Sequence, residues 1–552
     1  MPRFTKLAAF VALCALGLIA PAHADKRTVC TITVNSPDEQ AAMRRHLSER
    51  DYKFVELVEH GRTDWLATAC QQHVSCDVLV VSGHFNGTDF YTTRLDVNDH
   101  LPVAEMERAS CSASCPGLFS QLKEVYLFGC NSLNPDPGLS PTAEVERSLV
   151  RAGRSVADAG RMSRELGTLH AESNREVMRR IFVNVPAIYG FSSVAPLGPL
   201  SASLLNRAFQ SGSSAQIGSG RANRTLLGAF AANSMTLVQG MTASDPRARY
   251  RGEVCRFVDE RLSAAQRLRF IHQIVTRSTA EARMFFERIE TFLASLDDSE
   301  KQDPTFVAAL DEIANDHAAR DRYLALARDA EQPPIRARMI DVARTLHWLS
   351  AEEHRNELVR LMSDLLARTQ MSGADVDLIC SLNRSRAYDN ERGRLQRNAS
   401  SSERIDRAAA LACLGSADDH TRMLAAITSA SEIDVRMAEI YFYHRPITDT
   451  KELRAVTAGI ATMTRADVQV RALDTLARLH LTDRDVLAEL TNLFPRAASI
   501  GVQRAIAGIL IRADYRAIAS AELVSVFRDH RLRSPDGHDV IDILIRRLQA
   551  SS

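Results

Sequence analysis

The chain has no net charge and, beyond its first 24 residues, no long apolar run. Lys and Arg together number 68, as do Asp and Glu, so the broad basic surface typical of nucleic-acid-binding proteins is missing. No later stretch is apolar over the roughly 20 residues that a helix needs to cross a bilayer. We therefore expect no nucleic-acid partner and no membrane span.

Residues 1–24 have the order of features found in secretory signal peptides. Arg3 and Lys6 precede an apolar run from Leu7 to Ile19, and small residues end the segment at Ala24. The run is too short for a membrane anchor. We expect cleavage near Ala24. The Arg-rich, Lys-poor and Ala-rich composition favours a bacterial source, so the expected location is periplasmic or secreted.

The chain contains 10 cysteines, of which Cys14 would leave with the signal peptide. An oxidising compartment favours disulfides, and an odd number of cysteines leaves at least one of them without a partner inside the chain. The remaining cysteines are Cys30, Cys70, Cys76, Cys111, Cys115, Cys130, Cys255, Cys380 and Cys413. Any of these nine could be the odd one.

The cysteine spacing predicts structural bonds rather than a metal site. Cys111 and Cys115 lack a second close Cys or His pair at zinc spacing, so we expect no metal and a disulfide within their own loop. Cys380 and Cys413 are placed to join neighbouring helices.

Residues 25–245 alternate strand-like runs with helical patterns, which predicts an α/β domain with a mainly parallel sheet. A helical stretch is expected near 142–182, and the segment 200–255 looks like loop and linker. The five expected strands are Thr31–Val34, Lys53–Val58, Asp77–Val81, Glu124–Phe128 and Val185–Gly190.

Residues 250–552 read as helix after helix. Similar short segments surround Arg407, Arg436, Arg471 and Arg504, and their regular recurrence along the chain is typical of helical solenoids. The segments resemble HEAT repeats over about 330–552, which implies an all-α solenoid with a surface for a protein partner. The alternative is an irregular helical domain.

Two polar motifs follow neighbouring strands of the expected sheet. His84 comes after the third strand and Cys130 after the fourth. The carboxyl ends of adjacent parallel strands meet at one edge, so the imidazole and the thiol are expected to face each other. A thiol near an imidazole and backbone N–H groups is the arrangement of a cysteine nucleophile. The alternative is that Cys130 is a small buried apolar residue or half of a disulfide.

A strand ending in His, followed further along the chain by a strand ending in Cys, resembles the caspase-like cysteine peptidases of clan CD. The segment Leu127–Ser132 is most similar to the CHAT subgroup, as is the later strand Ala187–Ser193. The resemblance covers about 30–200. It implies a caspase-like fold, Cys130 as nucleophile, His84 as general acid/base, and an oxyanion hole formed by the backbone N–H groups of Phe85 and Cys130. No cofactor is implied.

The sequence departs from that family at one position. The family usually has Gly directly after the His, and Phe85 stands there. The leading hypothesis is an exported caspase-like endopeptidase that hydrolyses protein or peptide substrates through a Cys–His dyad. The alternative is a catalytically inactive scaffold that acts through its helical repeats. A pocket for Arg or Lys would need a buried carboxylate, for which Asp89 is one candidate among many.

Overall fold

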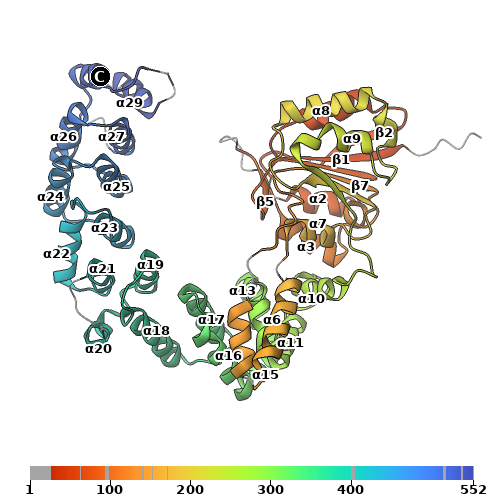
Figure 1. Ribbon diagram of the computed structural model, residues 1–552, viewed down its shortest axis with the longest axis horizontal. Coiled ribbons are helices and arrows are strands. Elements are labelled where there is room, and N and C mark those ends of the chain that lie inside the picture. The colour runs from red at the N-terminus through yellow and green to blue at the C-terminus, as the bar shows by residue number, and fades with distance from the viewer. Residues whose placement is uncertain are drawn as a thin grey trace, which may run out of the picture. The chain divides into compact units, whose positions relative to one another are not determined.

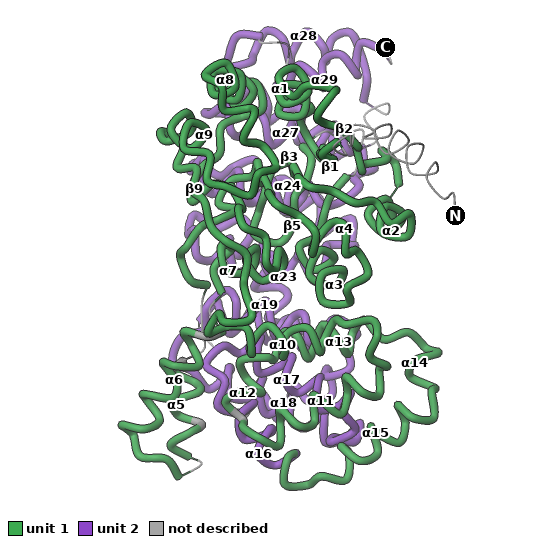
Figure 2. The backbone as a smooth tube through the Cα atoms, turned by 90° about the vertical axis from the view of Figure 1, so that its right-hand side faces the viewer, with its two compact units in different colours: residues 1–319 green, residues 320–552 purple. Residues whose placement is uncertain are grey.

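A computed structural model describes residues 26–550 except 63, 94–98, 139–141, 152, 171, 399–403, 514–517, 536 and 538. The expected signal peptide, residues 1–24, lies outside this described part. The chain divides into two compact units, one ending at Ala319 and the other beginning at Arg320 (Figure 2). The unit that holds the sheet thus extends past the 245–250 boundary expected from the sequence. No described helix is long and apolar enough to span a bilayer.

A six-stranded sheet forms the centre of the first unit (Figure 1). Its order is β2-β1-β3-β7-β8-β9, and every pairing is parallel except that of β9 with β8. The expected mainly parallel sheet is confirmed, and all five expected strands are present. The strands are β1 (Arg27–Thr33), β2 (Tyr52–Glu56), β3 (Val78–Ser82), β7 (Glu124–Phe128), β8 (Ala187–Phe191) and β9 (Met235–Val238).

Helices cover both faces of this sheet. On one face, α1 and α8 pack together and contribute Met43 and Leu205 to a buried cluster. On the other face, α2, α3 and α7 contribute Leu66, Met106 and Met178 (Figure 1). Helices of this part are α1 (Asp38–His46), α2 (Trp65–Gln71), α3 (Val103–Ser112), α4 (Pro116–Phe119), α5 (Thr142–Arg151), α6 (Val156–His170), α7 (Asn174–Ile181), α8 (Gly198–Gln210) and α9 (Arg224–Ala229).

Two parts of the fold were not expected. A second, antiparallel sheet of three short strands, β4 (His84–Phe85), β5 (Asp89–Tyr91) and β6 (His100–Pro102), follows β3 directly. The segment 200–255 is not mainly loop, because it contains most of α8, then α9 and β9, and enters α10 (Ala248–Val258). The short elements are held by long-range packing, which local sequence patterns do not reveal.

Four disulfides pair eight of the nine cysteines of the described part. They join Cys30 to Cys76, Cys70 to Cys115, Cys111 to Cys255, and Cys380 to Cys413. The expectation of a bond between Cys111 and Cys115 was wrong. Cys111 lies in α3 and bonds to α10, while Cys115, at the start of α4, bonds to α2. The expected staple between neighbouring helices at Cys380 and Cys413 is confirmed.

The rest of the first unit is helical. After α10 come α11 (Ala264–Arg277), α12 (Thr279–Met284), α13 (Phe286–Ser295), α14 (Asp298–Gln302) and α15 (Pro304–Ala314). Helix α12 packs on α5 and α6, and α10 packs on α3. Charged groups reinforce this packing: Arg180 of α7, buried to 1% side-chain exposure, bonds to Glu107 of α3 and Glu172, and Arg288 of α13 also bonds to Glu107.

The second unit consists of helices in two rows. Helices α19, α21, α23, α25, α27 and α29 pack in succession, and α22, α24 and α26 form another row (Figure 1). The helices from the unit boundary on are α16 (His317–Asp329), α17 (Pro333–Thr345), α18 (Ala351–Leu366), α19 (Gly373–Leu382), α20 (Arg392–Asn398), α21 (Ile405–Cys413), α22 (Ala417–Ala426), α23 (Glu432–His444), α24 (Thr450–Ala461), α25 (Ala466–Leu476), α26 (Arg484–Leu493), α27 (Ile500–Arg512), α28 (Ala521–Asp529) and α29 (Val540–Gln549).

A structural repeat is clearest between α25 and α27. Val468 and Gln469 are buried in α25, and Val502 and Gln503 are buried at the same places in α27, the next helix of the same row. Both glutamines donate a side-chain N–H to the carbonyl oxygen nine residues earlier, at 2.9 Å and 3.2 Å. The structural register therefore follows these buried pairs rather than the arginines that mark the repeat in the sequence.

Candidate active site

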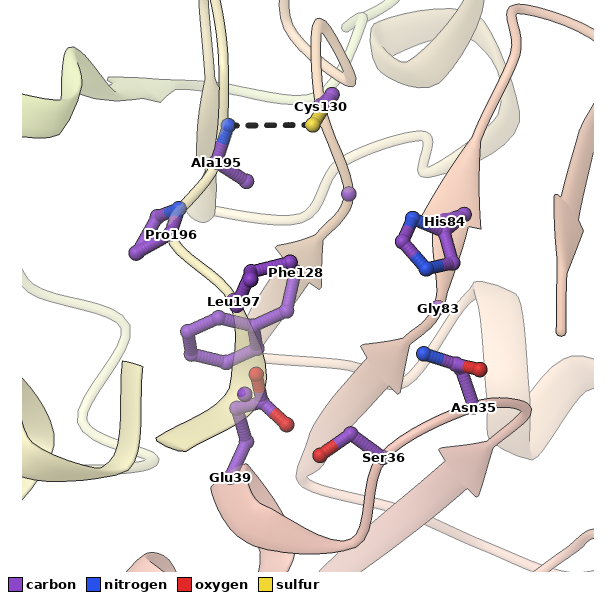
Figure 3. Close-up of a pocket in the computed structure, with 12 residues that line it drawn as sticks. Asn35, Ser36, Glu39, Gly83, His84, Phe128, Cys130, Ala195, Pro196 and Leu197 are labelled. Atoms are coloured by element: carbon purple, nitrogen blue, oxygen red, sulfur yellow. Dashed lines mark hydrogen bonds between the residues drawn. The ribbon is translucent and has the colours of Figure 1, made fainter. Parts of the chain in front are cut away.

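The segments that follow four neighbouring strands meet at one edge of the main sheet. They follow β1, β3, β7 and β8, all of which are parallel, so their carboxyl ends lie together. These segments and the first turn of α1 enclose a small cavity of about 50 Å³ (Figure 3). Its lining residues are Asn35, Ser36, Glu39, Gly83, His84, Phe128, Gly129, Cys130, Ala195, Pro196, Leu197 and Gly198. Both residues proposed from the sequence as a dyad, His84 and Cys130, are among them.

Cys130 lies two residues beyond the end of β7 and is half-buried. It is the single free cysteine of the described part. The backbone turns sharply here, since Asn131 has a φ of 58°. Gly129 allows Cys130 to sit close to the neighbouring strand, because a Cβ on Gly129 would lie 2.7 Å from the Cβ of Phe85. The sequence thus builds a tight corner that presents the thiol at the sheet edge.

The thiol of Cys130 is held by the loop after β8. The backbone N–H of Ala195 donates a hydrogen bond to its Sγ over 3.3 Å. This loop is itself anchored: the N–H of Asn131 donates to the carbonyl oxygen of Ser193 at 2.7 Å, and the hydroxyl of Ser193 bonds to that of Ser234. The thiol and the loop therefore form one connected network.

His84 begins β4 and faces the same cavity from the opposite side (Figure 3). Its ring packs against Tyr91, with ring centres 5.6 Å apart. Figure 3 shows the sulfur of Cys130 turned toward Ala195 rather than toward the imidazole. Within the described part of the chain, no hydrogen bond links His84 to Cys130 and no carboxylate bonds to the His84 ring.

The two backbone N–H groups expected to form an oxyanion hole can be placed. In the β4–β5 pair, Asn86 donates to Asp89 at 3.3 Å, so the next pair along, Phe85 with Phe90, is a non-hydrogen-bonded pair. The N–H of Phe85 therefore points away from β5. The N–H of Cys130 has no hydrogen-bond partner among the residues that the structure describes. Both donors are open to a ligand.

Phe85 has a structural reason at the position where the resembling family usually has Gly. Its side chain is buried and stacks on Phe90, with ring centres 4.6 Å apart. Its Cβ occupies the space that a side chain at residue 129 would need. The missing side chain has thus moved from residue 85 to Gly129, and the close approach of the two segments is kept.

Glu39 is a pocket residue that the sequence analysis missed. It lies in the first turn of α1, its residue is 3% exposed, and its Oε2 has no hydrogen-bond partner in the described structure. Burial raises the pKa of this carboxyl from 4.5 to about 7. Asp89, the carboxylate considered from the sequence, does not line the cavity and accepts a hydrogen bond from Thr88 instead. The one available signal was that Glu39 follows β1 at the same sheet edge.

No group of three or more His, Cys, Asp or Glu residues suited to a metal ion occurs in the described ranges. The arrangement at the sheet edge is that of an unpaired thiol, an imidazole, two open N–H donors and a buried carboxyl. Comparison with known proteins adds no relative to this picture: no family model, no curated protein and no solved structure matches the chain.

Proposed function

We propose that the chain is an exported, caspase-like cysteine endopeptidase that hydrolyses peptide bonds through Cys130 and His84. The observation that carries the proposal is the selective pairing of cysteines. Eight are bonded in four disulfides, while Cys130 alone is free and shares a cavity with His84. An oxidising compartment tends to consume spare thiols, so a thiol kept free beside an imidazole is best explained by its chemistry.

The reaction follows from the positions of these groups. The His84 imidazole accepts the proton of the Cys130 thiol, and the thiolate attacks the peptide carbonyl carbon. The N–H groups of Phe85 and Cys130 donate hydrogen bonds to the resulting oxyanion. His84 then gives its proton to the departing amine, which leaves a thioester on Cys130. A water molecule, deprotonated by His84, attacks the thioester, releases the carboxylic acid and restores the thiol.

One rearrangement must precede the attack. The Cys130 side chain has to leave the N–H of Ala195 and rotate toward His84. The bond that is lost is weak, because a thiol is a poor hydrogen-bond acceptor. We therefore assign the structure to a resting state of the peptidase.

The fold and the disulfides support the other parts of the proposal. A mainly parallel sheet with helices on both faces and reactive groups beyond its carboxyl ends is the architecture that the caspase-like resemblance implies. The four disulfides fit a periplasmic or secreted location after removal of residues 1–24. The helical repeats of the second unit, which we propose to be HEAT-like, offer a long surface for a protein substrate or partner.

A catalytically inactive scaffold is the second candidate. The observation that favours it is the present direction of the thiol, which contacts Ala195 and not His84. In that case the sheet unit serves as a platform, and the helical repeats carry the activity.

The two candidates are separated by activity-based labelling. Wild type should react with a peptidyl acyloxymethyl ketone and cleave unfolded casein, whereas Cys130→Ala should do neither and His84→Ala should lose most of both. His73→Asn is the matched control, since His73 is exposed and has a φ of 53° that Asn tolerates. A wild-type protein that neither reacts nor cleaves, while its His84→Ala variant keeps full biological activity, would establish the scaffold.

A further inference from the structure

The carboxyl of Glu39 is the least satisfied charged group in the cavity. Its residue is 3% exposed, and Oε2 makes no hydrogen bond within the described part of the chain. It shares the cavity with Cys130 and His84, and Figure 3 shows its side chain rising toward the cavity from α1. An ionisable group in such a position is costly unless a partner arrives with the ligand.

No basic side chain of the protein supplies that partner. The cavity lining contains no Lys or Arg, and the charged neighbour on the same helix is Asp38, which has the same sign. Burial accordingly raises the pKa of Glu39 to about 7, so that ionisation awaits a compensating charge. A cation placed beside Oε2 would provide both the hydrogen bond and the charge that are missing.

We propose that Glu39 binds the guanidinium or ammonium of an Arg or Lys residue immediately before the cleaved bond. The proposal rests on the endopeptidase function proposed above and makes Glu39 its specificity-determining residue. The order of groups fits this use. Cys130 and His84 line the same small cavity as Glu39, so a side chain that reaches the carboxyl has its own carbonyl near the thiol.

The wall of the cavity has the means to make room. At about 50 Å³ the cavity is smaller than an Arg or Lys side chain. Its outer wall is the segment 195–198, in which Leu197 is 71% exposed and so is not fixed by packing. The end of this wall is fixed at Gly198, where a Cβ would lie 2.1 Å from the Oγ of Ser36. An entering side chain displaces Ala195 and Leu197, and the same movement releases the Cys130 thiol from the Ala195 N–H.

The first test measures cleavage of fluorogenic peptides that differ only at the residue before the bond: Arg, Lys, Gln or Leu. We expect kcat/KM for Arg and Lys to exceed that for Leu by about 100-fold, the worth of a buried charge-assisted hydrogen bond. Glu39→Gln should lose that preference and retain the slow cleavage after Leu. Glu49→Gln, the same change at an exposed carboxylate, should behave as wild type. Equal rates after Arg and Leu, or a preference for Gln, would overturn the assignment while leaving the peptidase function intact.

A second test does not depend on turnover. Benzamidine, a small guanidinium-like cation, should slow the alkylation of Cys130 by iodoacetamide in wild type and in Glu49→Gln, with saturation at millimolar concentration, but not in Glu39→Gln. Protection in a protein that cleaves no peptide would refute the endopeptidase and keep the cation site. Absence of protection in wild type refutes the cation site whether or not peptides are cleaved.

Discussion

The backbone N–H of Ala195 lies 3.3 Å from the Sγ of Cys130 and donates a hydrogen bond to it. This contact joins the segment after β8 to the corner after β7. Because the loop around Ala195 is also tied to Ser234 through Ser192 and Ser193, the reactivity of the thiol depends on residues that never touch it.

Ser193→Ala should raise the reactivity of Cys130. The change removes the bond between the hydroxyls of Ser193 and Ser234, which is worth about 1 kcal/mol, so the open form of the loop should become about fivefold more populated. The second-order rate of Cys130 alkylation by iodoacetamide measures this directly. Ser211→Ala, which removes an exposed hydroxyl bond at the end of α8, is the control and should not change the rate. An unchanged rate in Ser193→Ala would show that the loop does not hold the thiol.

Gly129→Ala should damage the site and the fold together. The added Cβ would lie 2.7 Å from the Cβ of Phe85 and 2.9 Å from a ring carbon of Phe90, so one segment must shift. We expect a loss of about 1–3 kcal/mol in unfolding free energy, as for other overpacked cores, and at least tenfold slower labelling of Cys130 by an acyloxymethyl ketone.

Gly228→Ala serves as the comparison for that change. Gly228 lies in α9 and nothing is within 4 Å of its added Cβ, so Ala should stabilise by up to about 1 kcal/mol through helix propensity. Equal effects of the two substitutions on thermal unfolding would contradict the close approach at Gly129.

The buried carboxyl of Glu39 should make wild type less stable as the pH rises. Its folded pKa of about 7 exceeds the ordinary 4.5, so its contribution is fully present below pH 4.5 and is lost through pH 7. Glu39→Gln does not titrate. We therefore expect the two proteins to be similar at pH 4 and the variant to be more stable at pH 8, by on the order of 3 kcal/mol at most. Chemical unfolding at both pH values is the measurement; a variant that is no more stable at pH 8 contradicts the burial of this carboxyl.

Glu107 should have the opposite pH dependence. Burial alone would raise its pKa, but the charges of Arg180 and Arg288 outweigh burial and lower it to about 2. Its contribution is therefore present above pH 4.5 and is lost as the pH falls toward 2. Glu107→Gln should unfold more easily at pH 7 and lose less stability than wild type between pH 4.5 and pH 2. Parallel acid-unfolding curves for the two proteins would argue against the ion network.

The bond between Cys111 and Cys255 can be read by mass spectrometry. Trypsin cuts after Arg108 and Lys123, so Cys111 and Cys115 stay on one peptide. Without reduction, that peptide should be joined to those carrying Cys70 and Cys255, and a peptide closed on itself would contradict the structure. The double variant Cys111→Ser/Cys255→Ser should lose about 2–5 kcal/mol in unfolding free energy, the usual cost of removing a native disulfide.

The parts of the fold that the sequence predicted share a physical cause. Glu124–Phe128 is buried on both faces of a parallel sheet, and such strands are continuous apolar runs that can be recognised without a partner. The residues around His84 and Cys130 were found for the same reason, since each follows such a strand.

The parts that were missed depend on residues distant in the sequence. The strand His84–Phe85 has two residues and exists because Phe90 and Leu101 lie beneath a neighbouring loop. The partner of Cys111 is 144 residues away, a distance at which local spacing has no information. Glu39 looks like an ordinary acidic residue in the first turn of a helix until α1 is docked on the sheet.

The recurrence of Val468–Gln469 as Val502–Gln503 makes the length of the second unit adjustable in whole steps. Each row helix meets chiefly the helices before and after it, and one such step separates Ala466, where α25 begins, from Ile500, where α27 begins. Removing or duplicating one whole step would present the next helix with nearly the surface it already recognises. A gene encoding such an array can grow or shrink by unequal recombination, and the reach of the protein changes while the chemistry at the sheet edge is left alone.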